Sequence, residues 1–244
     1  MTDQWIYGFH AIRARLKLDA KSVLEVLMDE ARRDARAREL HGLCEQLGVP
    51  CRVVAGQRIE NLLGQARHQG VAARVLPRPK GAGLEELLDG MAGPALLIVL
   101  DGVTDPHNLG AVLRSADAFG AHAVIAPKDR AVGINATVEK VACGAAESVP
   151  YVMVTNLART LETLAERGIW TVAAEAGAAK RLPQIDARVP LAWVLGAEGA
   201  GLRRLTREHC DEAARIPMDG TVDSLNVSVS AALCLYETRR QRQP

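Results

Sequence analysis

Short apolar runs of strand length recur along the second half of the chain, and helical patterns separate them. In order they read ALLIVL, HAVIA, IWTVAA, LAWVL and AARIP, between residues 95 and 217. A strand that is apolar on both faces has to be covered on both faces, as it is in a parallel sheet between two layers of helices. The pattern therefore predicts an α/β fold with a parallel sheet and helices on both faces over residues 94–244.

The first 76 residues predict a smaller α/β domain. Helical pieces, GFHAIRARL and a charged segment around residues 33–47, alternate with the strand-like pieces VLEVLMD, CRVVA and VAARVL. Residues 77–93 carry prolines and glycines around one short apolar segment, which is typical of a linker. With 244 residues the chain is long enough for two domains. We expect a domain over residues 1–76, a linker over 77–93 and a second domain over 94–244.

Composition narrows the class of protein. The chain is 48% hydrophobic and has no apolar run long enough to cross a bilayer. Its first residues lack the uninterrupted apolar stretch of a secretory signal, so we expect a cytoplasmic protein without a membrane partner. Five scattered cysteines form no C-x-x-C pair and have no histidine at zinc-ligand spacing, which predicts free, mostly buried thiols and no metal. A net charge of +1 neither indicates nor excludes a nucleic-acid partner.

In parallel sheets, ligands bind at the carboxyl ends of the strands, so the loops after the apolar runs are the candidates for chemistry. The first of these loops is DGVTDPHNLGAVLR, residues 101–114. Asp105 is placed as the N-cap of a helix and Pro106 as its first residue. The buried stripe of that helix would be Leu109, Val112, Leu113, Ala116 and Phe119. Asn108 and Arg114 lie off the stripe, although a capped amphipathic helix with a surface arginine also explains the pattern.

Two further loops are polar or glycine-rich. GAEGAG, residues 196–201, would let a backbone approach a ligand and carries Glu198, but it could also be a tight turn. IPMDGTVDSLNVS, residues 216–228, precedes a helix for which Ser224 or Asn226 suits the N-cap. Its polar side chains exceed what a helix start requires.

Together, in this order and spacing, the three segments resemble the three motifs of the SpoU/TrmH family of RNA ribose 2′-O-methyltransferases, part of the SPOUT group. DPHNLGAVLRSADAFGA resembles the first motif, LGAEGAGL the second and IPMDGTVDSLNVSVSAAL the third. Ser115 stands where threonine is common. The N-terminal region is similar to the family's ribosomal-protein-L30e-like substrate-binding domain. YGFHAIRARL and VEKVACGAAESVPYVMVTNLARTL are most similar to the branch that methylates a guanosine of bacterial 23S ribosomal RNA.

The resemblance implies a fold and a reaction. The implied fold is α/β, with a C-terminal SPOUT-type sheet that contains a deep trefoil knot and a small N-terminal L30e-like domain. The implied cofactor is S-adenosyl-L-methionine, and the implied acceptor is a ribose 2′-hydroxyl of 23S ribosomal RNA, presented as naked RNA or in a pre-50S particle. Members of the family are homodimers with active sites near the interface.

Matching the motifs residue by residue implies two sets of site residues. The reaction centre would consist of Asn108, Arg114, Glu198, Ser224 and Asn226. The cofactor would be held at Leu195, Gly196, Gly201, Ile216, Met218 and Leu225. A guanidinium has a pKa above about 12 and is a poor base. We therefore expect Arg114 to stay charged, to anchor the adjacent phosphate and to stabilise the developing oxyanion, while the proton leaves through water or that phosphate.

Two other functions fit part of the pattern. The family also modifies tRNA, although the size of the N-terminal domain favours ribosomal RNA. A non-catalytic RNA-binding protein of ribosome assembly would share the fold but would have no reason to retain the motif residues.

Arginines and lysines of the N-terminal region are the candidates for RNA contacts. Arg74, Arg78 and Lys80 are the preferred ones. Arg32, Arg33, Arg36 and Arg38 are interleaved with acidic residues, which indicates a solvated face of one helix. Only 3% of the residues are aromatic, so recognition should rest on the shape of the RNA rather than on base stacking.

Overall fold

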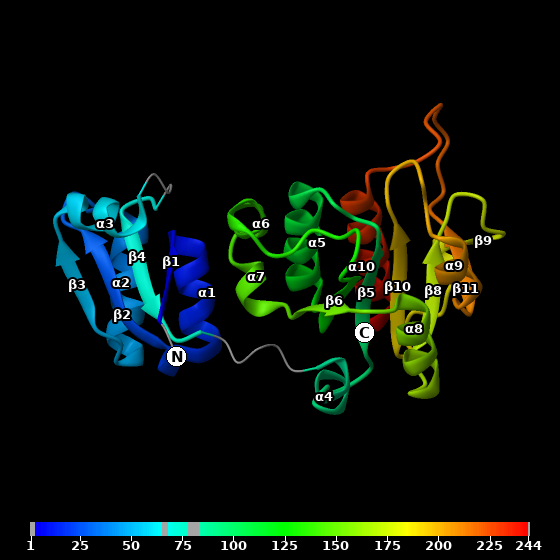
Figure 1. The fold of residues 1–244 in the computed structure, drawn as a ribbon, viewed down its shortest axis with the longest axis horizontal. Helices are drawn as coiled ribbons and strands as arrows, with labels where there is room; N and C mark the ends of the chain where they lie inside the picture. The colour runs from blue at the N-terminus through cyan, green and yellow to red at the C-terminus, as the bar shows by residue number, and fades with distance from the viewer. Residues whose placement is uncertain (1–2, 65–67, 78–82, 244) are drawn as a thin grey trace. The chain divides into compact units, whose positions relative to one another are not determined.

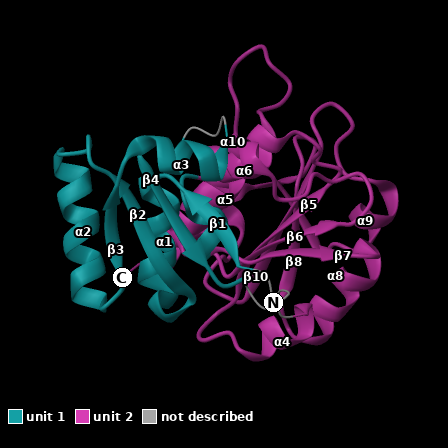
Figure 2. Cartoon of the chain, turned by 60° about the vertical axis from the view of Figure 1, so that its left-hand side comes forward, with its two compact units in different colours: residues 1–80, 143–148 teal, residues 81–142, 149–244 magenta. Residues whose placement is uncertain are grey.

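The structure is a computed structural model that describes residues 3–64, 68–77 and 83–243. It divides into two compact units, shown in two colours in Figure 2. Unit 1 comprises residues 1–80 with the short segment 143–148, and unit 2 comprises residues 81–142 and 149–244.

Unit 1 is a four-stranded sheet with helices on both faces. The strand order is β1 (Gln4–Tyr7), β4 (Val71–Val75), β2 (Val23–Asp29) and β3 (Cys51–Val54). Strands β2 and β3 run parallel and the other pairs antiparallel. The helices are α1 (Phe9–Asp19), α2 (Ala35–Leu47) and α3 (Gly56–Leu63), with the single turns η1 (Ala20–Ser22) and α7 (Ala145–Ser148). Helices α1 and α2 pack on one face, and Ile59 of α3 packs on the other.

The arginines around α2 differ from the expectation of one solvated helix face. Asp34 caps the helix by accepting from the backbone N–H groups of Arg36 and Ala37, so Arg32 and Arg33 precede it. Arg32 pairs with Asp34 at 3.0 Å and lies over the ring of Phe9 at 5.1 Å. The expectation failed for Arg32 and Arg33 because Asp34 takes the N-cap position, so the helix begins after them and only Arg36 and Arg38 lie on its exposed face.

A buried arginine joins α7 to the rest of unit 1. Arg15 on α1 donates to Ser22 Oγ at 2.7 Å, to the carbonyl of Leu76 at 2.8 Å and to Glu147 of α7 at 3.2 Å. Its side chain is 3% exposed and that of Glu147 13%. Gly144, in the same short segment, lies so close to α1 that a Cβ would stand 2.7 Å from the carbonyl oxygen of His10. A charge removed from water in this way is costly unless every donor is paired.

We expect Arg15→Met to lower the free energy of unfolding by about 3 kcal/mol, because it removes the three buried hydrogen bonds that the Arg15 side chain donates. Arg13→Met is the matched control on the same helix. Arg13 is 53% exposed and pairs with Glu39 only at 3.5 Å, so its replacement should cost no more than about 0.5 kcal/mol. Urea unfolding of both variants measures the difference, and equal losses would contradict the assigned role of Arg15.

Unit 2 is built on a seven-stranded parallel sheet (Figure 1). The strand order is β7 (Tyr151–Val154), β6 (Ala123–Pro127), β5 (Leu96–Asp101), β10 (Leu191–Gly196), β8 (Trp170–Ala174), β11 (Glu212–Arg215) and β9 (Lys180–Arg181). Every neighbouring pair is parallel. The helices are α4 (Leu84–Asp89), α5 (Pro106–Phe119), α6 (Ala136–Ala142), α8 (Leu157–Glu166), α9 (Arg204–Glu208) and α10 (Val227–Arg242), with the turn η2 (Leu182–Gln184). The predicted parallel α/β sheet is confirmed.

Helices cover both faces of this sheet. Leu97 and Val99 of β5 pack with Leu161 of α8 on one face. The alternate side chains point to the other face, where Trp193 of β10 donates its indole N–H to Thr238 of α10 at 2.9 Å. Helix α4 lies within the range 77–93, for which the sequence predicts a linker, and its Leu88 belongs to the core with α8.

None of the five cysteines, all of which lie in the described residues, forms a disulfide bond, as expected. Two are buried, Cys44 and Cys234, and the other three are half-buried. Burial raises the pKa of Cys210 and Cys234 to about 12. Among the described residues, no helix combines the length and the apolar character needed to span a bilayer.

Candidate functional site

Parallel strand pairing brings the three loops to one edge of the unit 2 sheet. Strand β10 pairs with β5 so that Gly196 lies opposite Asp101, and both strands end there. Strand β8 lies on the other side of β10, and β11 lies next to β8. Because parallel strands end at the same edge, the loops after all four strands meet. The segment that links β11 to α10, orange in Figure 1, extends beyond that edge, and its Val222 is 62% exposed.

Helix α5 begins as the sequence predicts. Asp105 accepts from the backbone N–H of His107 at 2.9 Å, and Pro106 occupies the first turn. This backbone hydrogen bond lowers the pKa of Asp105 below its ordinary value. The predicted stripe faces inward: Leu109, Val112, Leu113 and Ala116 are buried, and Phe119 is half-buried.

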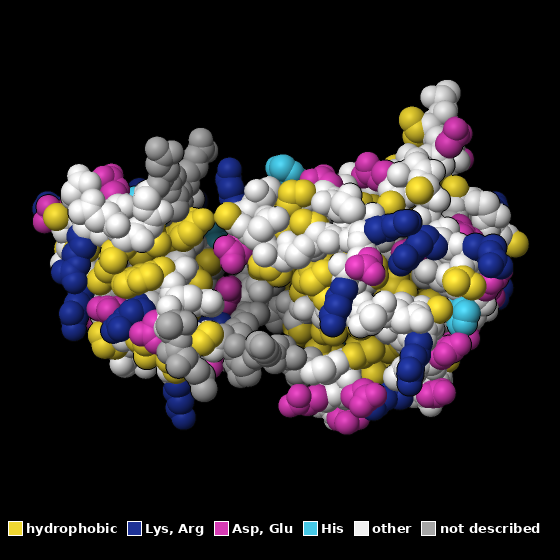
Figure 3. All heavy atoms as spheres, in the orientation of Figure 1, with side chains coloured by type: hydrophobic (Ala, Val, Ile, Leu, Met, Phe, Trp, Pro, Cys, Tyr) yellow, Lys and Arg dark blue, Asp and Glu magenta, His cyan; other side chains and the backbone are white. Residues whose placement is uncertain are grey.

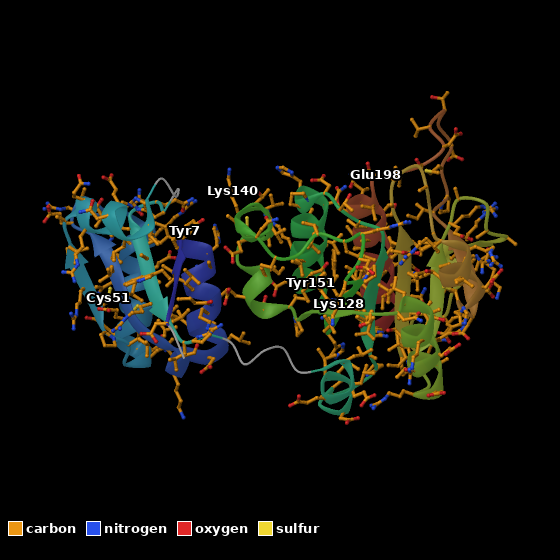
Figure 4. The ribbon with its side chains drawn as sticks, in the orientation of Figure 1. Tyr7, Cys51, Lys128, Lys140, Tyr151 and Glu198 are labelled. Atoms are coloured by element: carbon orange, nitrogen blue, oxygen red, sulfur yellow. The ribbon has the colours of Figure 1, made fainter. Side chains whose placement is uncertain are left out.

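Three predicted site residues from three separate loops form one hydrogen-bonded cluster. Asn108 donates through Nδ2 to Glu198 Oε1 at 3.2 Å. Asn226 donates through its Nδ2 to Asn108 Oδ1 at 2.9 Å and also to Glu198. Its Oδ1 meanwhile accepts from the N–H of Ser228 at 2.9 Å and so caps α10. Glu198 and Asn226 are exposed and Asn108 is half-buried, and Figure 4 shows Glu198 near the first turn of α10. The result is a solvent-facing polar centre fixed by a strand end and two helix starts.

The other two predicted reaction-centre residues lie on the segments that carry Asn108 and Asn226. Arg114 is exposed on α5, the helix that carries Asn108. Ser224 is exposed on the segment before α10 and lines the cavity described next. Figure 3 shows part of this segment standing clear of the surface of unit 2.

A cavity of about 650 Å³ opens beside the polar cluster. All six residues predicted to hold a cofactor line it, namely Leu195, Gly196, Gly201, Ile216, Met218 and Leu225. Glu198 belongs to both the cavity wall and the cluster. Small-molecule sites have volumes of this order and a mostly apolar lining with a few polar groups.

Sequence reasoning missed a third wall of the cavity. Glu175, Ala176 and Gly177, which follow strand β8, line it together with Asp223. Glu175 accepts from Arg207 Nε at 2.6 Å. A signal existed, since these residues follow the apolar run IWTVAA. These residues reach the cavity because β8 lies next to β10 in the sheet, however, and the order of the strands along the chain does not reveal that pairing.

The glycine-rich loop is folded back tightly on itself. Gly201 donates its N–H to the carbonyl of Ala197 at 2.9 Å. A Cβ on Gly196 would stand 2.1 Å from the carbonyl carbon of Gly201, so only glycine fits there. The loop therefore presents backbone rather than side chains to the cavity.

Of the predicted RNA contacts, Arg74 already has partners in unit 1. It pairs with Asp3 at 3.2 Å and Glu25 at 2.9 Å. Arg78 and Lys80 lie outside the described residues. Within the described part of the chain, no three His, Cys, Asp or Glu side chains are grouped to hold a metal ion.

A parallel sheet, a ligand-sized cavity and a polar cluster at its carboxyl edge define a small-molecule-dependent α/β enzyme. Comparison with known proteins shows which kind of enzyme this is. The model of the SpoU rRNA Methylase family matches residues 95–236, and that of the RNA 2′-O ribose methyltransferase substrate binding domain matches residues 5–80. The chain belongs to the SpoU rRNA Methylase family.

Individual relatives are similar over nearly the whole chain. The 23S rRNA (guanosine-2′-O-)-methyltransferase RlmB of Bordetella pertussis is 55% identical over 98% of both chains. The SpoU methyltransferase AviRb from Streptomyces viridochromogenes, solved in complex with the cofactor AdoMet, is 26% identical with a TM-score of 0.76, over 98% of this chain and 90% of that one. The A. aeolicus TrmH/SpoU tRNA modifying enzyme is 29% identical with a TM-score of 0.57, over 65% of this chain and 82% of that one.

Asn226 caps a helix and also belongs to the polar cluster, and these two contributions can be separated. We expect Asn226→Ala to lower the free energy of unfolding by about 1 kcal/mol, the usual cost of a lost N-cap. Asn156→Ala is the matched control, because Asn156 caps α8 by accepting from Arg159 N–H at 3.2 Å outside the cluster. Chemical denaturation should give similar losses. A loss of about 3 kcal/mol or more for Asn226→Ala alone would instead make the cluster a stabilising element of the fold.

Proposed function

We propose that the chain transfers a methyl group from S-adenosyl-L-methionine to the ribose 2′-hydroxyl of a guanosine in 23S ribosomal RNA. The observation that carries the proposal is the position of the Asn108–Glu198–Asn226 cluster at the rim of the cavity. Family membership and the printed activity of the full-length relatives support the acceptor. We also propose that the protein acts in the cytoplasm.

The residues of the cavity fit this cofactor. Leu195, Ile216 and Leu225 supply apolar contact for an adenine, and the glycine loop brings backbone groups within reach. Glu175, Glu198 and Asp223 line the same space, and no lysine or arginine does so among the described residues. Glu175 is paired with Arg207 behind the cavity wall, but a lining whose only charged side chains are carboxylates suits a ligand that carries positive charge, as a sulfonium with an ammonium group does.

The bound cofactor supplies an activated methyl group and a neutral leaving group, so the protein has to hold the acceptor hydroxyl in line with it. Positioning of this kind can lower a barrier by up to roughly 7–11 kcal/mol. Arg114 stays charged, binds the neighbouring phosphate and stabilises the developing oxyanion. Ser224 and the cluster orient the ribose, and the proton leaves through water or that phosphate.

Ribosomal RNA is preferred to tRNA because of the N-terminal region. The tRNA modifying relative matches only 65% of this chain, whereas the 23S enzymes match about 98%. We propose residues 1–76 as an L30e-like domain that binds naked RNA or a pre-50S particle, residues 77–93 as the connection and residues 94–244 as the methyltransferase domain. The match of residues 5–80 to the substrate binding model supports this division.

We further propose that unit 2 contains a trefoil knot and that the chain forms a homodimer. The exposed side chains of α10 support the homodimer. Val229, Leu233 and Tyr236 of α10 are 46%, 36% and 54% exposed, an apolar face that a second copy would cover. Tyr236 also packs edge-on against Phe119 at 6.1 Å, so the face continues onto α5. This surface begins next to Asn226, which supports active sites near the interface.

The fit of the cofactor to the glycine loop gives a prediction. Gly196→Ala should abolish detectable binding of S-adenosylmethionine at concentrations that saturate the wild-type protein, because the added Cβ forces the loop open. Gly133→Ala is the control, since a Cβ there meets nothing within 4 Å, and it should bind normally. Isothermal titration calorimetry measures both, and normal binding by Gly196→Ala would refute the assigned cofactor loop.

The reaction itself is tested by transfer of tritiated methyl groups to unmodified ribosomal RNA and to tRNA, followed by nucleoside analysis. We expect label in 2′-O-methylguanosine from 23S RNA. Arg114→Ala should lower kcat/KM by about 10²-fold. Arg188→Ala, which removes an exposed arginine paired with Asp186, should not. Label in tRNA alone would show that tRNA is the substrate instead. If the protein binds RNA but transfers no methyl group to either RNA, the result would favour a non-catalytic assembly factor.

A further inference from the structure

A buried carboxylate lies behind the glycine loop without lining the cavity. Asp101, the last residue of β5, has a side chain with 0% exposure. Arg203 donates its backbone N–H to Asp101 Oδ2 at 3.0 Å and its Nε–H to Oδ1 at 2.6 Å. Each oxygen therefore has a donor, and the charge is balanced by a guanidinium that is 45% exposed. Taking this charge out of water carries a desolvation cost that its hydrogen bonds and ion pair have to offset.

These contacts hold both ends of the loop at one place. Gly196, where the loop begins, lies opposite Asp101 in the sheet register. Arg203, where the loop ends, is bound by the Asp101 carboxylate. The residues between them, 197–202, carry Glu198 toward Asn108 and Asn226 and present Gly201 to the cavity. Asp101 therefore sets the distance between Gly196 and Arg203, the two ends of the loop.

The turn after β5 supports the loop from below. Gly102 has a φ of +82°, and a Cβ there would lie 3.5 Å from the Cβ of Ala197. The backbone at residues 101–103 thus packs directly beneath the start of the loop. The carbonyl of Val103 in this turn also accepts a hydrogen bond from the N–H of Val132 at 3.1 Å.

We propose that Asp101 is a positioning residue for the cofactor loop: through Arg203 it holds residues 196–202 in the conformation that binds S-adenosylmethionine. The inference rests on the proposed function. Asp101 reaches the cofactor through the loop rather than by contact, so its loss raises the free-energy cost of ordering the loop at each binding event. Binding of RNA and the chemical step at saturating cofactor do not depend on it.

Asp101→Asn is the sharpest variant because it keeps the shape of the side chain. The amide NH₂ then faces a donor of Arg203, so one hydrogen bond is lost together with the ion pair. We expect the Kd for S-adenosylmethionine to rise about ten-fold, with KM for the cofactor rising in parallel. The kcat at saturating cofactor and KM for RNA should stay near the wild-type values. Arg203→Ala keeps the backbone N–H bond and should raise Kd about three-fold.

Asp211→Asn is the control for general destabilisation. Asp211 accepts from the N–H of Thr171 at 2.8 Å and from its hydroxyl at 2.7 Å, next to the start of β8 rather than at the cavity. It should bind S-adenosylmethionine as the wild type does. Kd is measured by calorimetry on the full chain, kcat and KM by methyl transfer, and thermal melting reports the stability of each variant.

The outcomes separate the inference from the proposed function. Weaker cofactor binding in Asp101→Asn and Arg203→Ala but not in Asp211→Asn supports the positioning role. If Asp101→Asn binds S-adenosylmethionine with wild-type affinity, or if Asp211→Asn loses as much affinity as Asp101→Asn, the positioning role is wrong and the proposed function is unaffected. If Asp101→Asn does not fold, Arg203→Ala decides by the same criteria. Absence of binding by the wild-type protein would overturn the proposed function and this inference with it.

Discussion

The parallel pairing of β5 with β10 is the constraint on which the site depends. It brings the carboxyl ends of two strands, separated by ninety-five residues of chain from Asp101 to Gly196, to neighbouring positions at one edge. The polar cluster and the cavity both follow from this register. A shift by one residue would turn Gly196 and Asp101 away from each other and reverse the side chains that face α5 and α8. The buried Asp101 carboxylate then secures the loop that the register has placed.

Sequence pattern predicted the features that depend on neighbouring residues. The apolar runs correspond to β5, β6, β8, β10 and β11, because strands buried on both faces leave an uninterrupted apolar signal. Asp105 was also predicted as an N-cap, and Asn226 is one of the two residues, with Ser224, that the pattern offered for the second cap, since capping requires one short polar side chain at one position. The resemblance in motifs, rather than periodicity, indicated which polar residues would come together.

Features that depend on distant parts of the chain escaped the sequence analysis. Strand β7 is half-buried at every position, so it lacks the continuous apolar signal of the central strands, and β9 has only two residues. Helix α4 lies among the prolines and glycines that suggested a linker, but its leucines reach the core of unit 2. The place of Glu175 in the cavity wall depends on the order of the strands, and the pairing of Arg203 with Asp101 depends on how the glycine loop folds back. No local sequence pattern encodes either feature.

The central claim is that three loops at one sheet edge form a single site for cofactor and ribose. A crystal structure of the protein with S-adenosylmethionine tests it most directly. The account predicts the adenine between Leu195, Ile216 and Leu225 and the methyl group directed toward the Asn108–Glu198–Asn226 cluster. Cofactor bound elsewhere, or in this cavity with its methyl group turned away from the cluster, would contradict the account.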